Sequence, residues 1–480
     1  MALSCGRRLP ATCPNQRQEG ALFALLTLSA INLLNFADRF ILSSVKAPIQ
    51  KELELTDTQT SLPVTGMVLV YMVCAPIFGV LVDRRFVDRR VLLSCAIAFW
   101  SAATAAAGFA ENFTQLVVFR SLIGVGEAAF SSIVPPMLSD FYPARDRNVV
   151  FTVFGLASPL GGALGFGAGA LLGSAFGWRK AFLFCGSPGI LVAFLIMFLN
   201  DPPRGINDDA ESDMKKKPQQ TSLFNDVCSI LSNPAYMIVC LGQCAQSFAL
   251  GAFSDWYGTL LVRYTGTSLA VAGLVLSAAT VVGGIGGSLM GAKAAQFYEP
   301  RWKNAYFLVP ALFTIPGAVL AFGAVNLLFN SNVAFACIVT AELFFFTYGP
   351  PMQTISITVM PVHLRSRSSG IQIFLIHILG DIISPPIVGF VSDQTGSLQL
   401  AMQISWMAIL VAGLIWFVGY QFLPPLHISN GGNAGKSKDI DDMGLRSTTA
   451  TATWSTVTSV DATWKPSDRL NNLREALLPI

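Results

Sequence analysis

Apolar residues run through this chain in long stretches separated by short polar segments. We count twelve stretches, and each approaches or exceeds the roughly 20 residues that a helix needs to cross a bilayer. The pattern predicts an all-α polytopic membrane protein. The stretches lie at residues 21–45, 61–82, 91–110, 115–139, 148–173, 180–199, 234–262, 268–292, 304–328, 332–359, 368–391 and 399–423.

Composition supports this interpretation. Only 12% of residues are charged and 53% are hydrophobic, whereas soluble domains are about 25% charged. An ordinary soluble protein is therefore excluded. The N-terminus lacks the short apolar core and small-residue cleavage site of a signal peptide, so we expect the first helix to be an uncleaved anchor. The cysteines show neither a disulfide framework nor a zinc-binding spacing.

Basic residues predict the orientation. If both termini face the cytoplasm, most of the 31 Lys and Arg residues lie on that side, as the positive-inside rule requires. The outer loops then hold few basic residues, such as Lys46 and Arg263. The net charge of +3 hides this asymmetry and says nothing about nucleic acid, which we do not expect as a partner.

The helices divide six and six around a polar segment, and the two sets resemble each other. In the first set, Glu127 is followed by Pro135-Pro136-Met137. In the second set, Glu342 is followed at the same spacing by Pro350-Pro351-Met352. A parallel repeat of this kind is typical of carriers that rock two halves around a midplane site. The predicted parts are a cytoplasmic tail (1–20), a first bundle (21–199), a linker (200–233), a second bundle (234–424) and a disordered tail (425–480).

Glycines recur every four residues in two of the predicted helices and form grooves that permit close backbone approach. Two interpretations are open: the grooves face each other and slide between the halves, or each packs within its own half. The glycines are Gly161, Gly165, Gly169 and Gly173, and then Gly283, Gly287 and Gly291.

Ionised side chains inside two apolar stretches are the strongest functional signal. Each costs roughly 2.5 kcal/mol or more at membrane depth and usually faces a cavity. Asp38 and Arg39 lie in the first stretch, and Arg120 and Glu127 lie in the fourth. A carboxylate here can alternate between a protonated and an Arg-paired state, and a guanidinium can bind a phosphate bidentately. We therefore predict a substrate-binding and proton-coupling site.

Other charged positions are ambiguous. Glu342 is a candidate because it is the counterpart of Glu127 in the repeat, whereas the counterpart of Arg120 is Phe335. His377 and Asp381 are four residues apart and share a helix face, which fits either a packing pair or a proton relay. Asp255 lies near the outer end of its helix, where a capping role is the simpler interpretation.

A charged motif follows the second predicted helix. An acid at this cytoplasmic helix end can bridge to amides and arginines of the opposite half and so close the inner side. A solvated positive loop is the alternative, but it explains neither the glycine nor the acid. The residues of this cytoplasmic gate motif are Gly79, Asp83, Arg84, Arg89 and Arg90.

The motif resembles the signature loop of the major facilitator superfamily, and other segments resemble its Spinster family. The resemblance extends over residues 20–425 and implies the major facilitator fold. It also implies alternating-access transport of lysophospholipids or sphingosine-1-phosphate, with proton coupling, at lysosomal, endosomal or plasma membranes. Asp88 departs from the motif, where a small or polar residue is commoner. The matching segments are Asp38-Arg39, Ala75 to Gly79, Gly124 to Ala128, Pro202 to Gly205, and Gln372 to Pro385.

These observations favour a secondary transporter of an amphipathic lipid over an enzyme. The three histidines are too scattered for a metal triad, and the chain lacks a phosphate-binding P-loop, so we expect no metal or cofactor. The expected partners are the lipid and protons, and the expected state is a monomer. A carrier of small organic anions such as sugar acids and a lipid scramblase remain alternatives.

Overall fold

A computed structural model describes residues 18–83, 88–203, 206–207, 223–361 and 364–424. Over these ranges the chain forms helices and no strands. The predicted tail over 425–480, nearly all of the tail over 1–20, and Arg84 lie outside the described residues.

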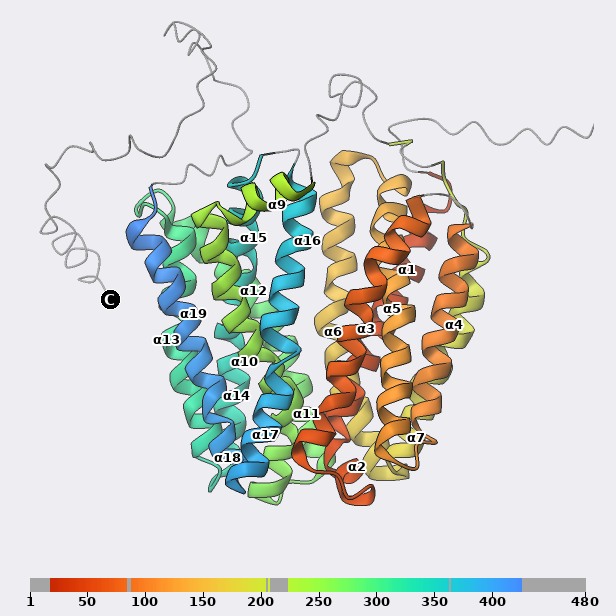
Figure 1. Cartoon of the computed structure of the whole chain (residues 1–480), viewed down its shortest axis with the longest axis vertical. Coiled ribbons are helices and arrows are strands. Elements are labelled where there is room, and N and C mark those ends of the chain that lie inside the picture. Colours follow the sequence, from red (N-terminus) through yellow and green to blue (C-terminus); the bar gives the residue numbers. More distant parts are fainter. Residues whose placement is uncertain (1–17, 84–87, 204–205, 208–222, 362–363, 425–480) are drawn as a thin grey trace, which may run out of the picture. The chain divides into compact units, whose positions relative to one another are not determined.

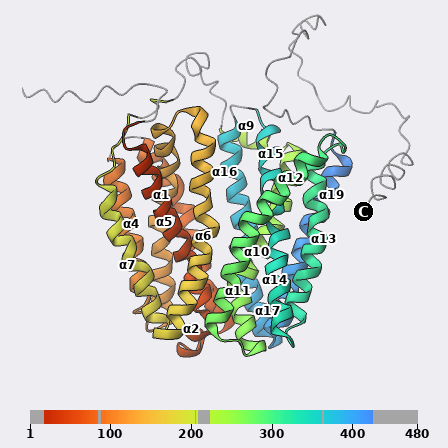
Figure 2. The same ribbon diagram turned by 180° about the vertical axis from the view of Figure 1, so that it is seen from behind.

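The described helices belong to one compact unit and form two bundles side by side, seen from both directions in Figures 1 and 2. The first bundle contains α1 (Ala21–Ser44), α2 (Lys46–Glu52), α3 (Asp57–Asp83), α4 (Arg89–Ala107), α5 (Phe113–Phe141), α6 (Ala144–Phe176) and α7 (Trp178–Ile196). The second contains α10 (Pro234–Thr265), α11 (Leu269–Val281), η1 (Val282–Gly287), α12 (Ser288–Tyr298), α13 (Ala305–Asn326), α14 (Ser331–Phe345), η2 (Phe346–Tyr348), α15 (Gly349–Thr358), α16 (Arg365–Ile376), η4 (His377–Asp381), α17 (Ser384–Thr395), α18 (Leu398–Ala401) and α19 (Gln403–Phe422).

Twelve helical spans in the described part are long and apolar enough to cross a membrane. They match the twelve predicted stretches one for one, from Ala21–Ser44 to Leu398–Phe422. The prediction of an all-α, twelve-helix protein in two six-helix bundles is therefore confirmed.

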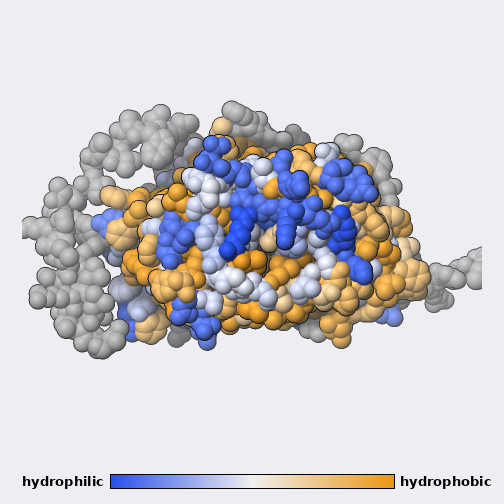
Figure 3. Space-filling model, turned by 90° about the horizontal axis from the view of Figure 1, so that it is seen from below, coloured by the Kyte–Doolittle hydropathy of each residue, from blue (hydrophilic) through white to orange (hydrophobic). Residues whose placement is uncertain are grey.

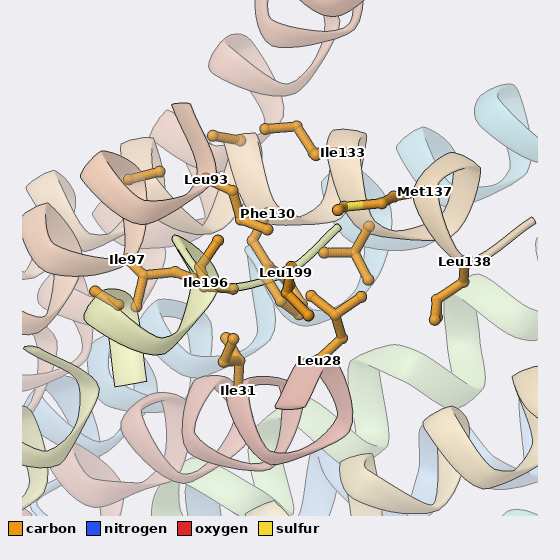
Figure 4. Packing of buried hydrophobic residues seen from close by; sticks show 14 of the residues in the cluster. Leu28, Ile31, Leu93, Ile97, Phe130, Ile133, Met137, Leu138, Ile196 and Leu199 are labelled. Atoms are coloured by element: carbon orange, nitrogen blue, oxygen red, sulfur yellow. The ribbon is translucent and has the colours of Figure 1, made fainter. Parts of the chain in front are cut away.

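The core of the first bundle lies among α1, α4, α5 and the end of α7. Leu28 and Ile31 of α1 meet Ile97 of α4 and Phe130 of α5 there (Figure 4). Lipid is as apolar as leucine, so such helices are held by close packing more than by exclusion of water. Small residues at the helix contacts therefore stabilise the bundle, because they let the helices approach closely.

The two glycine grooves pack within their own halves. A Cβ built on Gly165 of α6 would lie 3.0 Å from the Ala37 Cα of α1, and one on Gly283 of η1 would lie 2.7 Å from the Glu342 carbonyl oxygen of α14. Static packing is thus the arrangement that the structure shows. Other small residues let α6 approach α11 and η1 across the two halves; a Cβ on Gly284 would lie 2.6 Å from the Pro159 Cβ.

Three predicted helices of the second half are interrupted. Wide π-turns form η1 and η4, and a 3₁₀ turn forms η2. At η4 the cause is local: Pro385 lacks the N–H that would bond the Asp381 carbonyl in a regular helix. π-turns are rare and often occur at functional sites, and this one contains both His377 and Asp381.

The segment predicted as a linker contains a short helix, α9 (Leu223–Leu231). Ile230 of α9 is buried against Tyr236 and Leu364 of the second bundle, and Asp226 forms an ion pair with Arg367 near the start of α16. This part of the segment is therefore docked onto the second bundle.

Candidate functional site

Arg39 and Glu127 form an ion pair between α1 and α5. The Arg39 Nη2 and Nε lie 2.8 and 2.9 Å from Glu127 Oε2. The Glu127 side chain is 1% exposed, whereas that of Arg39 is 21% exposed. Arg120 and Glu127 of α5 are seven residues apart, which is about 10.5 Å along a helix. The partner of Glu127 therefore comes from the neighbouring helix α1.

Arg120 binds backbone, not a carboxylate. It is fully buried, and its Nη1 and Nη2 donate to the carbonyl oxygens of Asp38 at 3.0 Å and Arg39 at 3.4 Å. The buried Asp38 carboxylate accepts a hydrogen bond from Thr104 Oγ1 of α4 at 3.4 Å. Arg120 therefore holds α1 against α5, and Arg39 is the arginine of this cluster whose side chain is partly exposed.

His377 and Asp381 lie opposite this cluster, in η4 of the second half. The His377 Nδ1 lies 2.9 Å from each Asp381 carboxylate oxygen. The His377 ring meets the Tyr71 ring of α3 edge-on, with 6.4 Å between centroids, and Arg39 Cζ lies 5.2 Å from the centroid of Tyr71. The structure thus brings four charged or aromatic residues from both halves into one row.

Glu342 lies apart from this row. It is buried in α14 at the close contact with Gly283 and forms no ion pair with any residue that the structure describes. Its assignment to the coupling site stays a prediction based on the repeat.

The cytoplasmic gate motif is only partly described. Gly79 lies near the C-terminal end of α3, and Asp83 is the last residue of that helix. Arg89 is buried and binds Asp140 at 2.6 Å and Asp201 at 2.5 Å, so it ties α4 to other parts of the first half. Arg90 binds Asp88 at 2.9 Å, and this hydrogen bond lowers the pKa of Asp88. A bridge from Asp83 to the opposite half stays a prediction.

A second polar cluster, which we call the outer seam, joins the halves at the end that the charge pattern places outside. Lys46 of α2 forms an ion pair with Asp255 of α10, and its ammonium lies 3.8 Å from the centroid of the Trp256 ring. Ser43 donates to Asp255 at 2.9 Å. Burial lowers the pKa of Lys46, and the Asp255 carboxylate opposes that effect. The capping role suggested for Asp255 is wrong, because it lies inside α10.

Further contacts of the outer seam join α3 to α10 and α17. Asp57 binds Arg263 at 2.5 Å and accepts a hydrogen bond from Ser392 at 2.5 Å. Asp393 accepts hydrogen bonds from the Thr58 N–H at 2.9 Å and its hydroxyl at 2.6 Å. Figure 3 shows hydrophilic residues across the middle of this face.

Sequence reasoning placed Lys46 and Arg263 of the outer seam in outer loops. One signal was available, since Lys46 and Arg263 are basic residues on the side where the positive-inside rule expects few. No group of three or more His, Cys, Asp or Glu side chains that could hold a metal occurs in the described part.

Comparison with known proteins identifies the family. The family model "Major Facilitator Superfamily" matches residues 28–385. A sphingosine-1-phosphate transporter SPNS2 of Danio rerio is 32% identical over 79% of this chain and 79% of its own length. Protein spinster homolog 1 of Xenopus tropicalis is 29% identical over 83% of this chain and 79% of its own.

Solved structures show the same fold. A bacterial homologue of the human lysosomal transporter Spinster, in an inward-facing and occupied conformation, aligns with a TM-score of 0.72 at 20% identity. The alignment covers 84% of this chain and 97% of that one. The relatives are transporters, not enzymes. This chain is a multi-pass membrane transporter that belongs to the Spinster family of the major facilitator superfamily.

Proposed function

We propose that this protein moves a lysophospholipid or sphingoid phosphate by alternating access, coupled to protons. The observation that carries the proposal is the environment of Arg39. Its guanidinium is partly exposed, paired with Glu127 and flanked by the rings of Phe36 and Tyr71. A guanidinium binds phosphate oxygens bidentately, and aromatic rings favour a cation that is shielded from water. The likeness to a sphingosine-1-phosphate transporter supports a phosphorylated lipid as the substrate.

Proton coupling follows from the competition for Arg39. While Glu127 is ionised it occupies the guanidinium at 2.8 Å, and a phosphate must displace it. Protonation of Glu127 removes that competitor and spares the buried carboxylate an unpaired charge, which is costly. A proton on Glu127 and a phosphate on Arg39 therefore bind together and are released together.

The outer seam keeps the two halves together at the outer end of the protein. Its ion pairs are Lys46–Asp255 and Asp57–Arg263. We therefore expect substrate to enter and leave this conformation from the cytoplasmic end. Transport to the outside requires the seam to separate. We propose a lysosomal, endosomal or plasma membrane as the location and a monomer as the working unit.

The test is transport in proteoliposomes with three substrates: sphingosine-1-phosphate, a lysophospholipid and a sugar acid, each with and without a pH gradient. We expect a lipid to move and the gradient to drive its accumulation. Glu127→Gln should exchange lipid but no longer respond to the gradient, because a neutral amide cannot cycle a proton. A normal gradient response in that variant would remove Glu127 from the coupling role.

Two other results would overturn the lipid proposal. Movement of the sugar acid alone would indicate a carrier of small organic anions. Equilibration of lipid between leaflets without saturation or a response to the gradient would indicate a scramblase.

A further inference from the structure

The carboxylate of Asp381 is an unexplained charge in the row between the halves. Its side chain is 30% exposed, and in the described part its hydrogen-bond partner is His377. The His377 Nδ1 lies 2.9 Å from both Asp381 carboxylate oxygens, so the two oxygens share one ring nitrogen and keep capacity for a further donor. Charged groups at this depth are costly and usually mark a ligand or ion path.

The position of Asp381 relates it to Arg39. From Arg39 the row continues through Tyr71 at 5.2 Å to His377 at 6.4 Å, each measured to ring centroids, and ends at the carboxylate. A cationic and an anionic group, each partly exposed, thus lie at the two ends of a row whose middle is formed by Tyr71 and His377.

This juxtaposition matches a headgroup that carries both charges. We propose that Asp381 binds the protonated amine of a lipid whose phosphate is held by Arg39, so that the site selects single-chain lipids with an amine beside the phosphate. The proposal rests on the proposed function and deepens it. Tyr71 lies in the row between the two charges, and an aromatic ring beside the site adds an attraction for a cation.

The geometry of η4 supports this role. The π-turn and the proline at 385 free the backbone around Asp381 from regular helical bonding. Gly251 of α10 lets the turn approach closely, because a Cβ there would lie 2.9 Å from the Asp381 Cα. The carboxylate is therefore fixed by packing on the second half, while Arg39 is fixed on the first. A ligand that bridges both would sense the relative position of the halves.

The test compares two lipids in proteoliposomes: sphingosine-1-phosphate and its N-acetyl derivative, which keeps the phosphate and the main chain but has no basic amine. We expect the wild-type protein to have an apparent KM at least tenfold lower for the free amine. In Asp381→Asn this difference should fall to about twofold or less, through a higher KM for the free amine and an unchanged KM for the acetylated lipid. Asp381→Glu, which keeps the charge, should restore part of the discrimination.

Glu111→Gln is the matched control, since it removes an exposed carboxylate from the loop between α4 and α5, and it should behave as wild type. Equal wild-type KM values for the two lipids would overturn the inference. So would an Asp381→Asn variant that loses its pH-gradient response while keeping the discrimination, because that result would assign the His377–Asp381 pair to a proton relay. Failure of the wild type to move either lipid would instead overturn the proposed function.

Discussion

At the scale of single residues, burial separates two arginines that look equivalent in the sequence. Both lie in apolar stretches that also contain an acid, but Arg120 is enclosed and bonded to backbone carbonyls. Arg39 keeps an exposed edge beside Tyr71. Arg120 therefore has the environment of a residue that stabilises helix packing, and Arg39 has the environment of a residue that binds a ligand.

We therefore expect the two alanine variants to differ in kind. Arg120→Ala removes two hydrogen bonds from a charged donor to α1, at about 1.5–3 kcal/mol each, and should lower the melting temperature in detergent with little change in substrate KM. Arg39→Ala should raise the KM for sphingosine-1-phosphate about tenfold or more and lower the melting temperature less, because Glu127 can take up a proton. Thermal unfolding and uptake kinetics measure both. The reverse assignment of the two effects would show that Arg120 is the headgroup ligand.

At the scale of helices, the position of each glycine relative to its neighbours decides its role. Gly165 and Gly155 both lie in α6. A Cβ at Gly165 would meet the backbone of α1, whereas one at Gly155 would meet nothing within 4 Å. The repeated spacing in the sequence does not distinguish a packed glycine from a free one.

Gly165→Ala should destabilise the protein by roughly 1–3 kcal/mol, as overpacking does, because the nearest obstacle is backbone that cannot rotate away. Gly155→Ala should be neutral or stabilise by about 0.4–1 kcal/mol, since alanine restricts the unfolded chain more than glycine. Melting temperatures of the two purified variants test this contrast. Equal effects would mean that α1 and α6 can separate without cost.

At the scale of the whole molecule, the outer seam decides which side is closed. Its charges come from both halves, so separation of the halves at this end must break Lys46–Asp255 and Asp57–Arg263. Buried ion pairs are costly to break one partner at a time, by about 3–5 kcal/mol. Loss of one partner therefore penalises the closed arrangement more than an open, hydrated one.

Asp255→Asn should shift the population toward an outward-open state. A cysteine at position 65, whose native threonine donates to the Ile382 carbonyl oxygen across the halves at 3.0 Å, reports this opening. On a background without native cysteines, a water-soluble maleimide added outside should label it at least tenfold faster, a shift of about 1.4 kcal/mol. Glu111→Gln should leave the labelling rate unchanged, and an unchanged rate in Asp255→Asn would show that the Lys46 pair does not hold the seam.

The sequence by itself determined the number of spans, their order and the position of intramembrane charge. These follow from local composition, because a bilayer demands about 20 apolar residues per crossing and tolerates few charges. The spans predicted at 21–45 and 399–423 accordingly agree with Ala21–Ser44 and Leu398–Phe422 to within a residue.

Only the tertiary structure decided which charges meet. Arg39 pairs with Glu127, and Lys46 with Asp255, over separations of 88 and 209 residues. No spacing rule along one helix predicts such contacts, because they depend on which faces of distant helices pack together. The same packing buried Arg120, left Arg39 partly exposed and placed Asp381 on the opposite half.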